Sequence, residues 1–347
     1  MEYIAMDVHK RYSVVRVEDQ AGELLDERRL AHQEGVFRAY LETRAKGSPV
    51  AIETTGNWYW VVDEVETAGQ RPRLVNAWLA KRMMGQIHKS DRLDCRGLNR
   101  LQRTGTLPTV WIASAELRDR RELPRTRMML VAMRTRLKNR IHAVLAKHGL
   151  DIEASDVFGR RGRVELAAAI GRLPAETAFA TAVVLREIDA VQSEIDRLDE
   201  RIGQVFAPTA AAKRLRTLPG IGAVLSVVIL AEIGDIARFG RPEALASYAG
   251  LVPRLHATGG KMRLGKTPRR QVSLTLKWAF VEAANAAVLN ARRSGRNSHV
   301  LALYKRVRAK RDHGHAVVAV ARHLAEASHA VLTRRVDYRD PANRTQG

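Results

Sequence analysis

The sequence contains a single cysteine, Cys95, in 347 residues. One thiol excludes an intrachain disulfide and any zinc site built from several cysteines. The chain also lacks a secretory leader and any long apolar run free of charges, so we expect a soluble, cytoplasmic protein with no membrane partner. Aromatic residues are scarce, at 5% of the chain.

Acidic residues are the minority charge. Asp and Glu number 37 against 59 Lys and Arg, which gives a formal net charge of +22 and a pI near 10.9. This excess favours a polyanionic partner, nucleic acid first of all. A basic surface that is merely solvated, or ribosome-like, is the alternative, because charge alone does not specify chemistry. The length and the 46% hydrophobic content indicate two or three domains, each with its own core.

Residues 1–112 predict an α/β domain. Three short strands come first, then helices and strands alternate, which is the order of a ribonuclease H-like domain. The expected elements are strands at 3–6, 13–18 and 23–30, a helix at 34–46, a strand in "SPVAIETTG", a helix at 58–68, a strand in "RPRLVNA", and a helix that carries Asp91 and Asp94.

Four carboxylates are expected to meet at one edge of this sheet. Asp91 and Asp94 leave one face of their helix, where they repel each other unless a cation lies between them. Asp7 closes the first strand, and Glu53 lies in an apolar strand that should pair beside it. Oxygen ligands alone suit one or two Mg²⁺ ions and in-line phosphoryl chemistry. Alternatively, Asp7 only ends a strand, Glu53 pairs with an arginine, and both other acids are exposed.

Residues 113–207 predict a helical, coiled-coil region. A long basic helix or helix pair should run to about residue 148 and end at Gly149. After a looser segment, "DVFGRRGRVE", a second helix carries apolar residues at alternating steps of four and three, an a/d seam. The seam consists of Val184, Ile188, Val191, Ile195, Leu198, Ile202 and Val205. It indicates a helical hairpin, a coiled coil with another protomer, or a surface helix facing a core.

Residues 208–335 predict a mostly helical domain after a break at Pro208, followed by a frayed polar tail at 336–347. The segment "LRTLPGIGAVLSVVILAEIG" has the pattern of a helix-hairpin-helix, in which Gly220 and Gly222 let the backbone approach a phosphate. A plain turn between helices is the alternative. Near the end we expect a basic helix, a turn at Gly314 and an apolar helix.

A glycine-rich basic loop is expected between residues 254 and 270. It places a hydroxyl, that of Thr258, among glycines and cations, a composition typical of phosphate binding. Expected nucleic-acid contacts in and beyond this loop are Lys89, Arg92, Arg254, Gly259, Gly260, Lys261, Arg263 and Lys266.

Several of these segments together resemble one family over nearly the whole chain. The segments are "MDVHK", "IETTG", "KSDRLD", "LPGIG", "YAGLVPRLHATGGKMRLGK" and "LKWAFVEAAN". They resemble the DEDD-type insertion-sequence transposases, which include bridge-RNA-guided recombinases with a RuvC-like N-terminal domain, a coiled-coil middle and a C-terminal transposase domain.

The resemblance implies roles for particular residues. Asp7, Glu53, Asp91 and Asp94 would be the metal-binding acids, with Mg²⁺ as cofactor. The family's nucleophile is a serine that attacks DNA to form a covalent intermediate, and Thr258 occupies that position here. Its hydroxyl is retained, but its methyl group restricts the rotamer and crowds in-line attack. Cys95 stands where relatives commonly have alanine, which we interpret as a tolerated core change.

The resemblance also implies partners. They are double-stranded DNA at the element ends and target, a noncoding guide RNA, and further copies of the chain in a dimer or tetramer. Base pairing would then read sequence while a protein rich in Lys and Arg reads backbone shape. Two rival hypotheses remain open: a RuvC-type junction nuclease that uses water as nucleophile, and a catalytically decayed copy that only binds nucleic acid.

Overall fold

The computed structural model describes residues 1–54, 56–85, 90–206, 209–253, 255–258, 261–265, 272–295 and 298–342. Of residues 255–258 and 261–264 it describes the strands but not the side chains. The chain forms two compact units, Met1–Ala115 and Glu116–Gly347, and each is described by itself. Among the described residues, no helix is both long and apolar enough to cross a membrane.

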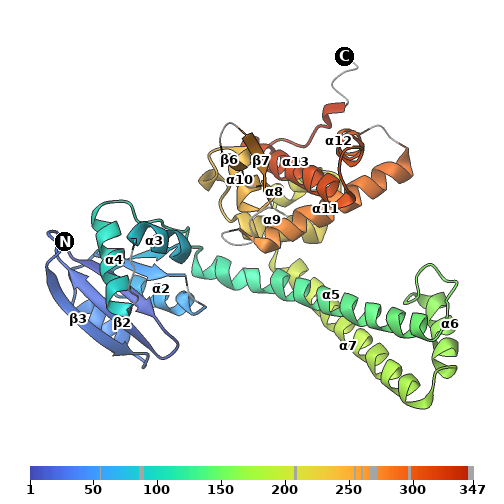
Figure 1. The fold of residues 1–347 in the computed structure, drawn as a ribbon, viewed down its shortest axis with the longest axis horizontal. Coiled ribbons are helices and arrows are strands. Elements are labelled where there is room, and N and C mark those ends of the chain that lie inside the picture. Colours follow the sequence, from blue (N-terminus) through green and yellow to red (C-terminus); the bar gives the residue numbers. More distant parts are fainter. Residues whose placement is uncertain are drawn as a thin grey trace. The chain divides into compact units, whose positions relative to one another are not determined.

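The first unit contains a five-stranded sheet in the order β3-β2-β1-β4-β5 (Figure 1). The strands are β1 (Tyr3–Val8), β2 (Tyr12–Glu18), β3 (Leu24–Ala31), β4 (Pro49–Glu53) and β5 (Arg71–Val75). The first three are antiparallel, whereas β1, β4 and β5 run parallel. The predictions that the first strand is central, and that the strand of Glu53 lies beside it, are confirmed.

Strand alternation divides the residues of this unit between two cores. Ile4, Met6 and Ile52 point to one face, where they pack with α1 (Val36–Glu42) and α2 (Trp58–Thr67). Ala5 and Ala51 point to the other, under Cys95 and Leu98 of α4 (Asp91–Arg103). Two alanines at this level let α4 lie close to the sheet.

The sequence predicted these elements with two errors. The helix expected at 34–46 is shorter, because Gly35 before it is left-handed, with φ 76°. The helix α3 (Ala77–Met84) was missed. Its side chains include exposed Trp78, Leu79 and Met83, so its apolar residues show no clear core-facing stripe. It begins at Asn76, whose side chain accepts a hydrogen bond from the Leu79 N–H.

The second unit begins with a helical hairpin. Its helices are α5 (Ala115–Lys147), α6 (Arg160–Gly171) and α7 (Ala175–Val205), and α5 runs unbroken through Pro124. Arg127 in the first half of α5 pairs with Asp199 near the end of α7 at 2.9 Å, while Ile141 packs with Ile188. The two long helices are therefore antiparallel neighbours within one chain (Figure 1).

The expected seam of α7 is largely buried: Ile188, Val191, Ile195 and Ile202 are all core residues. The prediction of a loose segment before α7 is wrong in part, because residues 160–171 form the helix α6. Gly162 suggested a loop, but a Cβ there would lie 2.2 Å from the Asp156 carbonyl oxygen. This glycine allows close packing inside a helix.

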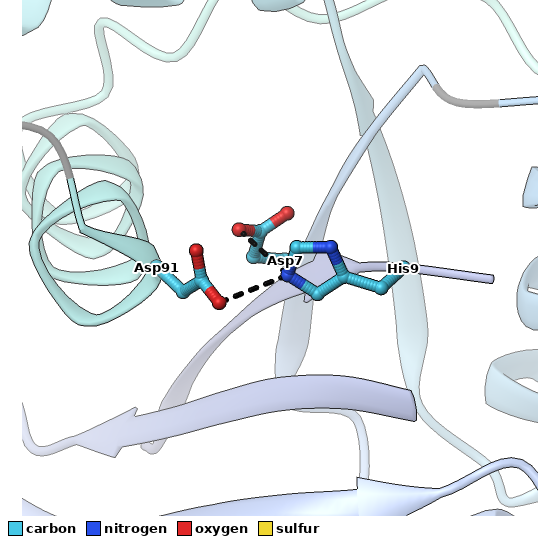
Figure 2. A group of neighbouring side chains, drawn as sticks. All are labelled: Asp7, His9 and Asp91. Atoms are coloured by element: carbon cyan, nitrogen blue, oxygen red, sulfur yellow. Dashed lines mark hydrogen bonds and ion pairs between the residues drawn. The ribbon is translucent and has the colours of Figure 1, made fainter. Parts of the chain in front are cut away.

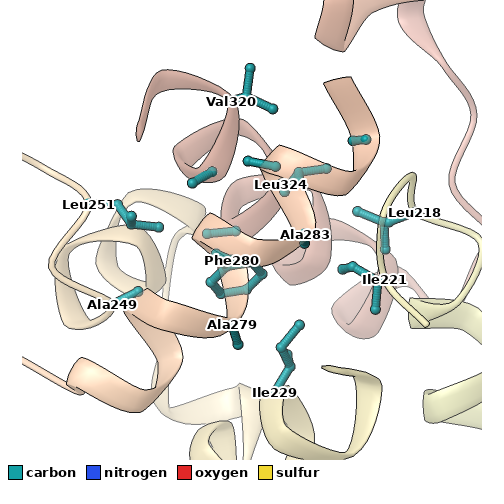
Figure 3. Close-up of a cluster of buried hydrophobic side chains, with 14 of the residues drawn as sticks. Leu218, Ile221, Ile229, Ala249, Leu251, Ala279, Phe280, Ala283, Val320 and Leu324 are labelled. Atoms are coloured by element: carbon teal, nitrogen blue, oxygen red, sulfur yellow. The ribbon is translucent and has the colours of Figure 1, made fainter. Parts of the chain in front are cut away.

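The rest of the second unit packs around one apolar core (Figure 3). Phe280 of α11 lies at its centre, near Ile229, and five buried alanines of α11 permit close helix contacts. The elements are α8 (Ala210–Leu215), α9 (Ala223–Ile233), η1 (Ile236–Arg238), α10 (Pro242–Tyr248), β6 (Leu255–Thr258), β7 (Lys261–Leu264), α11 (Leu274–Ser294), α12 (His299–Arg308) and α13 (His313–Arg334).

Two predictions near the C-terminus are wrong. Gly314 lies in the first turn of α13, because the Asp312 side chain already accepts a hydrogen bond from the His315 N–H and starts the helix there. Residues 336–342 of the tail are anchored, since Asp340 accepts hydrogen bonds from the His299 N–H and the Tyr338 N–H donates to Thr217. Pro208, the expected domain break, lies outside the described residues.

Candidate metal centre

The register of β1 and β4 determines the position of two of the predicted acids. Met6 and Ile52 form the last pair in the register of these parallel strands, so Asp7 and Glu53 come one residue later at the same level. Adjacent parallel strands point equivalent residues to the same face. That face is the one on which Ala5 and Ala51 pack under α4. Asp7 and Glu53 therefore lie beyond the alanines, on the side of the sheet that α4 covers.

The other two acids come from the start of α4. Ser90 precedes the helix and accepts a hydrogen bond from the Leu93 N–H, so Asp91 and Asp94 occupy its first turn. Carboxylates are favoured there by the unpaired amide groups and the helix dipole. Asp94 is buried, with 7% of its surface exposed. The helix end that carries two acids is thus also suited to hold them without a metal.

Polar contacts fix α4 on the sheet. Asn99 donates to the Arg16 carbonyl at 3.1 Å, and Gln102 donates to the Ile4 carbonyl at 2.8 Å. The Cys95 thiol lies 3.4 Å from the Val14 carbonyl. Cys95 is fully buried, and burial raises its pKa, as expected for a core residue. These contacts set the position of Asp91 relative to β1.

His9 lies between acids of the strand and the helix (Figure 2). Its Nε2 is 2.9 Å from Asp91 Oδ2 and 3.5 Å from Asp7 Oδ2. Ligand atoms of the three residues all lie within 4.8 Å of one another. The ring of His9 packs on Tyr12 at 4.5 Å, and its carbonyl accepts a hydrogen bond from Asn57. Sequence reasoning missed His9, although it lies only two residues after Asp7.

The electrostatics of this group suit a cation. Burial raises the pKa of Asp7, the nearby His9 acts in the opposite direction, and the charges of Asp91 and Asp94 raise it further. Carboxylates that repel one another in this way are relieved by a bound divalent ion. The donors are carboxylate oxygens, one of them oriented by the imidazole of His9, so the residues present fit a divalent metal.

The structure therefore supports a shared site more directly for some of the four predicted acids than for others. Asp7 and Asp91 meet directly, Asp94 is close enough to influence the pKa of Asp7, and Glu53 is positioned by strand register. A site formed by all four acids stays a prediction. Of the cations expected beside them, Arg92 pairs with Glu27 at 3.0 Å, and Lys89 lies outside the described residues.

The predicted loop around Thr258 contains a β-hairpin. Thr258 ends β6 and pairs in register with Lys261, the first residue of β7, and Arg263 pairs with His256. Residues 255–258 and 261–264 are therefore paired strands inside the segment that was predicted as a loop, which corrects that prediction. Arg254, Gly259, Gly260 and Lys266 lie outside the described residues, so their predicted contacts stay predictions.

The two glycines of "LPGIG" have different surroundings. Gly220 has φ +80°, and a Cβ there would lie 2.0 Å from the Ala283 carbonyl oxygen. Its small size is therefore required by packing against α11. Gly222 precedes α9, and a Cβ there would meet nothing within 4 Å. Only Gly222 has open space in which a phosphate could approach the backbone.

Acids at the strand ends of such a sheet, beside a helix that carries further acids, define a class: metal-dependent enzymes that act on nucleic-acid phosphodiesters. Residues 4–149 match the DEDD transposase profile of IS110, and residues 212–300 match the profile of the transposase IS116/IS110/IS902 family. The two matches do not overlap and together span more than half of the chain. The chain belongs to this family of transposases, which are DNA-recombining enzymes.

Individual relatives agree with this assignment. A Pseudomonas aeruginosa protein named "Probable family 20 transposase" is 28% identical over 250 residues, which cover 69% of this chain and 71% of the relative. The Coxiella burnetii transposase for insertion sequence element IS1111A is 28% identical over 261 residues, 73% of this chain and 69% of the relative.

Proposed function

We propose that this transposase cuts and rejoins double-stranded DNA at a centre formed by Asp7, Glu53, Asp91 and Asp94, with Mg²⁺ as the metal. The observation that carries the proposal is the convergence of Asp7, His9 and Asp91 at one end of the sheet. Burial and neighbouring carboxylates raise the pKa of Asp7, which is the situation that a divalent cation relieves.

The chain's own residues would orient the reacting phosphate. Asp7 and Glu53 belong to a rigid sheet and Asp91 to a helix anchored on it, so the carboxylates keep a fixed spacing. His9 holds Asp91 through a hydrogen bond at 2.9 Å. A bound Mg²⁺ supplies positive charge that stabilises the charge developing on the phosphate oxygens.

Thr258 is the proposed nucleophile. Its Oγ forms a bond to phosphorus while the bond to the 3′ oxygen breaks, and the proton lost by the threonine ends on the released 3′ hydroxyl. The product is a phosphodiester that links Thr258 to the 5′ end of the downstream strand, while the upstream strand ends in the free 3′ hydroxyl. This bond retains the energy of the original one, so a 3′ hydroxyl from another DNA end can reverse the step without ATP.

Several finer features belong to the same proposal. A noncoding guide RNA selects the DNA, and the net charge of +22 suits a protein that holds two nucleic acids. The chain acts in the cytoplasm, on the chromosome, as a dimer or tetramer, and the a/d seam of α7 packs as a coiled coil against α5 of the same chain. Residues 210–233 act as a helix-hairpin-helix on DNA. We also propose that residues 1–112, 113–207 and 208–335 are three functional regions, followed by the tail at 336–347.

The test compares four variants on a DNA substrate that carries the element's own junction, together with candidate RNA from its flanks. We expect Asp7→Asn and Thr258→Ala to abolish joining, and Thr258→Ala also to abolish the covalent protein–DNA adduct. Thr258→Ser should retain or increase both, while Arg163→Gln on α6, which is assigned to neither site, serves as control. Unchanged metal-dependent cutting by Thr258→Ala would favour a hydrolytic nuclease. No activity in any variant, Thr258→Ser included, would favour a decayed copy.

A further inference from the structure

Two cavities share Lys10, two residues after the end of β1, and one of them also contains His9. One, of about 400 Å³, is lined by Val8, His9, Lys10, Gly56, Asn57 and Trp60. The other, of about 560 Å³, is lined by Lys10, by residues 32–35 between β3 and α1, and by residues of α1 and α2. Lys10 and Trp60 line both. The two cavities therefore adjoin at Lys10 and Trp60, and we call them together the groove; His9 lines the smaller cavity and belongs to the acidic cluster.

The wall of the groove is aromatic and held in place. The ring of Trp60 packs edge-on against Phe37 at 5.3 Å and against His32 at 4.7 Å. His32 is hydrogen-bonded to the Ser13 hydroxyl at 2.8 Å, and burial lowers its pKa. Trp60 is only partly buried in the core beneath it, so a braced indole faces the groove in a chain that is 5% aromatic.

One cation of the groove is available to a ligand. Arg38 makes two hydrogen bonds to Glu64, at 2.7 and 3.1 Å, which neutralise its charge. Lys10 is exposed, and within the described ranges no carboxylate lies at ion-pair distance from it. Lys10 follows His9 directly and, like Trp60, lines both cavities.

We propose that this groove binds one unpaired nucleotide of the DNA strand that the acidic cluster acts on, with the base stacked on Trp60 and a phosphate at Lys10. The inference rests on the proposed function. Aromatic side chains bind any base through its π-face, and a lysine beside them binds the backbone. A base inside a duplex is already covered by its neighbours, so only an unstacked nucleotide can present its face. The cavity volumes are within the range usual for small-ligand sites.

The experiment measures binding of a labelled single-stranded oligothymidylate to the full chain in Mg²⁺, with a duplex of the same length for comparison. Trp60→Leu removes the stacking face but keeps an apolar contact with Phe37, and Trp60→Phe keeps a smaller ring. Trp78→Leu, on exposed α3 and outside both cavities, is the matched control. Replacing one thymine by 5-iodouracil, which crosslinks to stacked aromatic rings under light, identifies the contacted residue.

We expect Trp60→Leu to weaken single-strand binding about five- to a hundredfold, the usual range for loss of one stacked base. Duplex binding should be unchanged, Trp60→Phe intermediate, and the crosslink at Trp60. Exposed Lys10→Ala tests the phosphate contact if Trp60→Leu fails to fold, and should also weaken single-strand binding.

Three results would overturn the inference: equal losses for Trp60→Leu and Trp78→Leu, a crosslink outside the groove, or an effect seen only with oligouridylate, which would assign the groove to RNA. These readouts concern binding, so they are separate from the DNA-joining assay. If Asp7→Asn abolishes joining while Trp60→Leu binds normally, the metal centre stands and the groove does not. If Asp7→Asn still joins DNA while Trp60→Leu binds single strands weakly, the groove is supported and the proposed metal centre is not.

Discussion

His9 Nε2 lies 2.9 Å from Asp91 Oδ2, although 82 positions separate the two residues in the chain. The contact joins the end of β1 to the first residue of α4. The side chain of Asn57, which precedes α2, donates a hydrogen bond to the carbonyl of His9 and so holds the backbone there. Three separate elements therefore determine where the Asp91 carboxylate points.

This relationship predicts a positioning role for His9. We expect His9→Ala to reduce metal affinity and DNA joining about 10- to 100-fold, the usual cost of losing a partner that orients a metal ligand. His9→Gln, which can still donate a hydrogen bond to Asp91, should recover a large part of the loss. The measurement is joining as a function of Mg²⁺ concentration. If excess Mg²⁺ does not rescue His9→Ala at all, a role limited to positioning is excluded.

Asp7→Asn should have opposite effects on stability with and without metal. Without metal it removes the carboxylate whose pKa is raised by burial and by the charges of Asp91 and Asp94, so the melting temperature should rise or stay constant. With Mg²⁺ at a hundred times its dissociation constant, the wild type should gain about 2.7 kcal/mol, and the variant should gain little. Thermal melts in EDTA and in Mg²⁺ measure both effects.

Asp26→Asn is the control for that experiment. Burial alone would raise the pKa of Asp26. Hydrogen bonds from Arg28 and Tyr40 outweigh that effect, so the pKa of Asp26 is lowered. Removing this charge should destabilise the unit in either buffer while leaving the Mg²⁺ effect intact. Loss of the Mg²⁺ effect in both variants would show that it arises from general unfolding.

The sheet could be predicted from the sequence because its signals are local. Apolar alternation indicated the strands, and the positions of Ala51 and Glu53 within one strand already put both on the same face. The a/d seam of α7 was predicted for the same reason. The helices α3 and α6 were missed because tertiary packing decides them: Gly162 is needed against the Asp156 carbonyl, a contact that composition does not reveal.

The candidate site was predicted only in part. Asp7, Glu53, Asp91 and Asp94 stand out as carboxylates in apolar or helical surroundings. His9 does not, since a histidine after a strand has many structural uses, and its partner Asp91 lies far along the chain. The groove depends on Trp60, Phe37 and His32, which come together only when α1, α2 and the end of β3 fold onto one another.

Gly220→Ala should destabilise the second unit. The left-handed backbone costs an alanine about 1–2 kcal/mol, and a Cβ 2.0 Å from the Ala283 carbonyl forces a backbone shift that costs about 1–3 kcal/mol more. Gly222→Ala, where the Cβ meets nothing, should change the free energy of unfolding by less than about 1 kcal/mol. Urea unfolding of both variants measures the difference. Equal effects would contradict the packing role of Gly220.

Glu232→Ala should be among the most destabilising changes in the second unit. Glu232 is 2% exposed, accepts two hydrogen bonds from Arg125 and a third from Ser273 before α11, and so joins α5, α9 and α11. Breaking a buried pair costs about 3–5 kcal/mol. Asp189→Ala breaks the more exposed pair with Arg163 and should cost less than about 1 kcal/mol. Chemical denaturation compares them, and similar losses would refute the ranking.

His323 should make the second unit less stable in acid. Burial lowers its pKa below the usual 6.5, and the neighbouring His299 of α12 acts in the same direction. Glu326 on its own helix and Asp340 in the tail oppose the shift, and the Tyr338 hydroxyl lies 3.4 Å away. Because the folded state binds the proton less readily than the unfolded state, this contribution is complete above the unfolded pKa and decreases as pH falls below it.

Urea midpoints at about pH 7.5 and about pH 5.5 test this sign. The wild type should lose stability at the lower pH, and His323→Gln, which cannot be protonated, should lose less. His315→Gln on the same helix, where the histidine is exposed and paired with Asp312, should leave the wild-type loss unchanged. A wild type that gains stability between these two pH values, by an amount that His323→Gln abolishes, would mean that His323 is protonated more readily in the folded state.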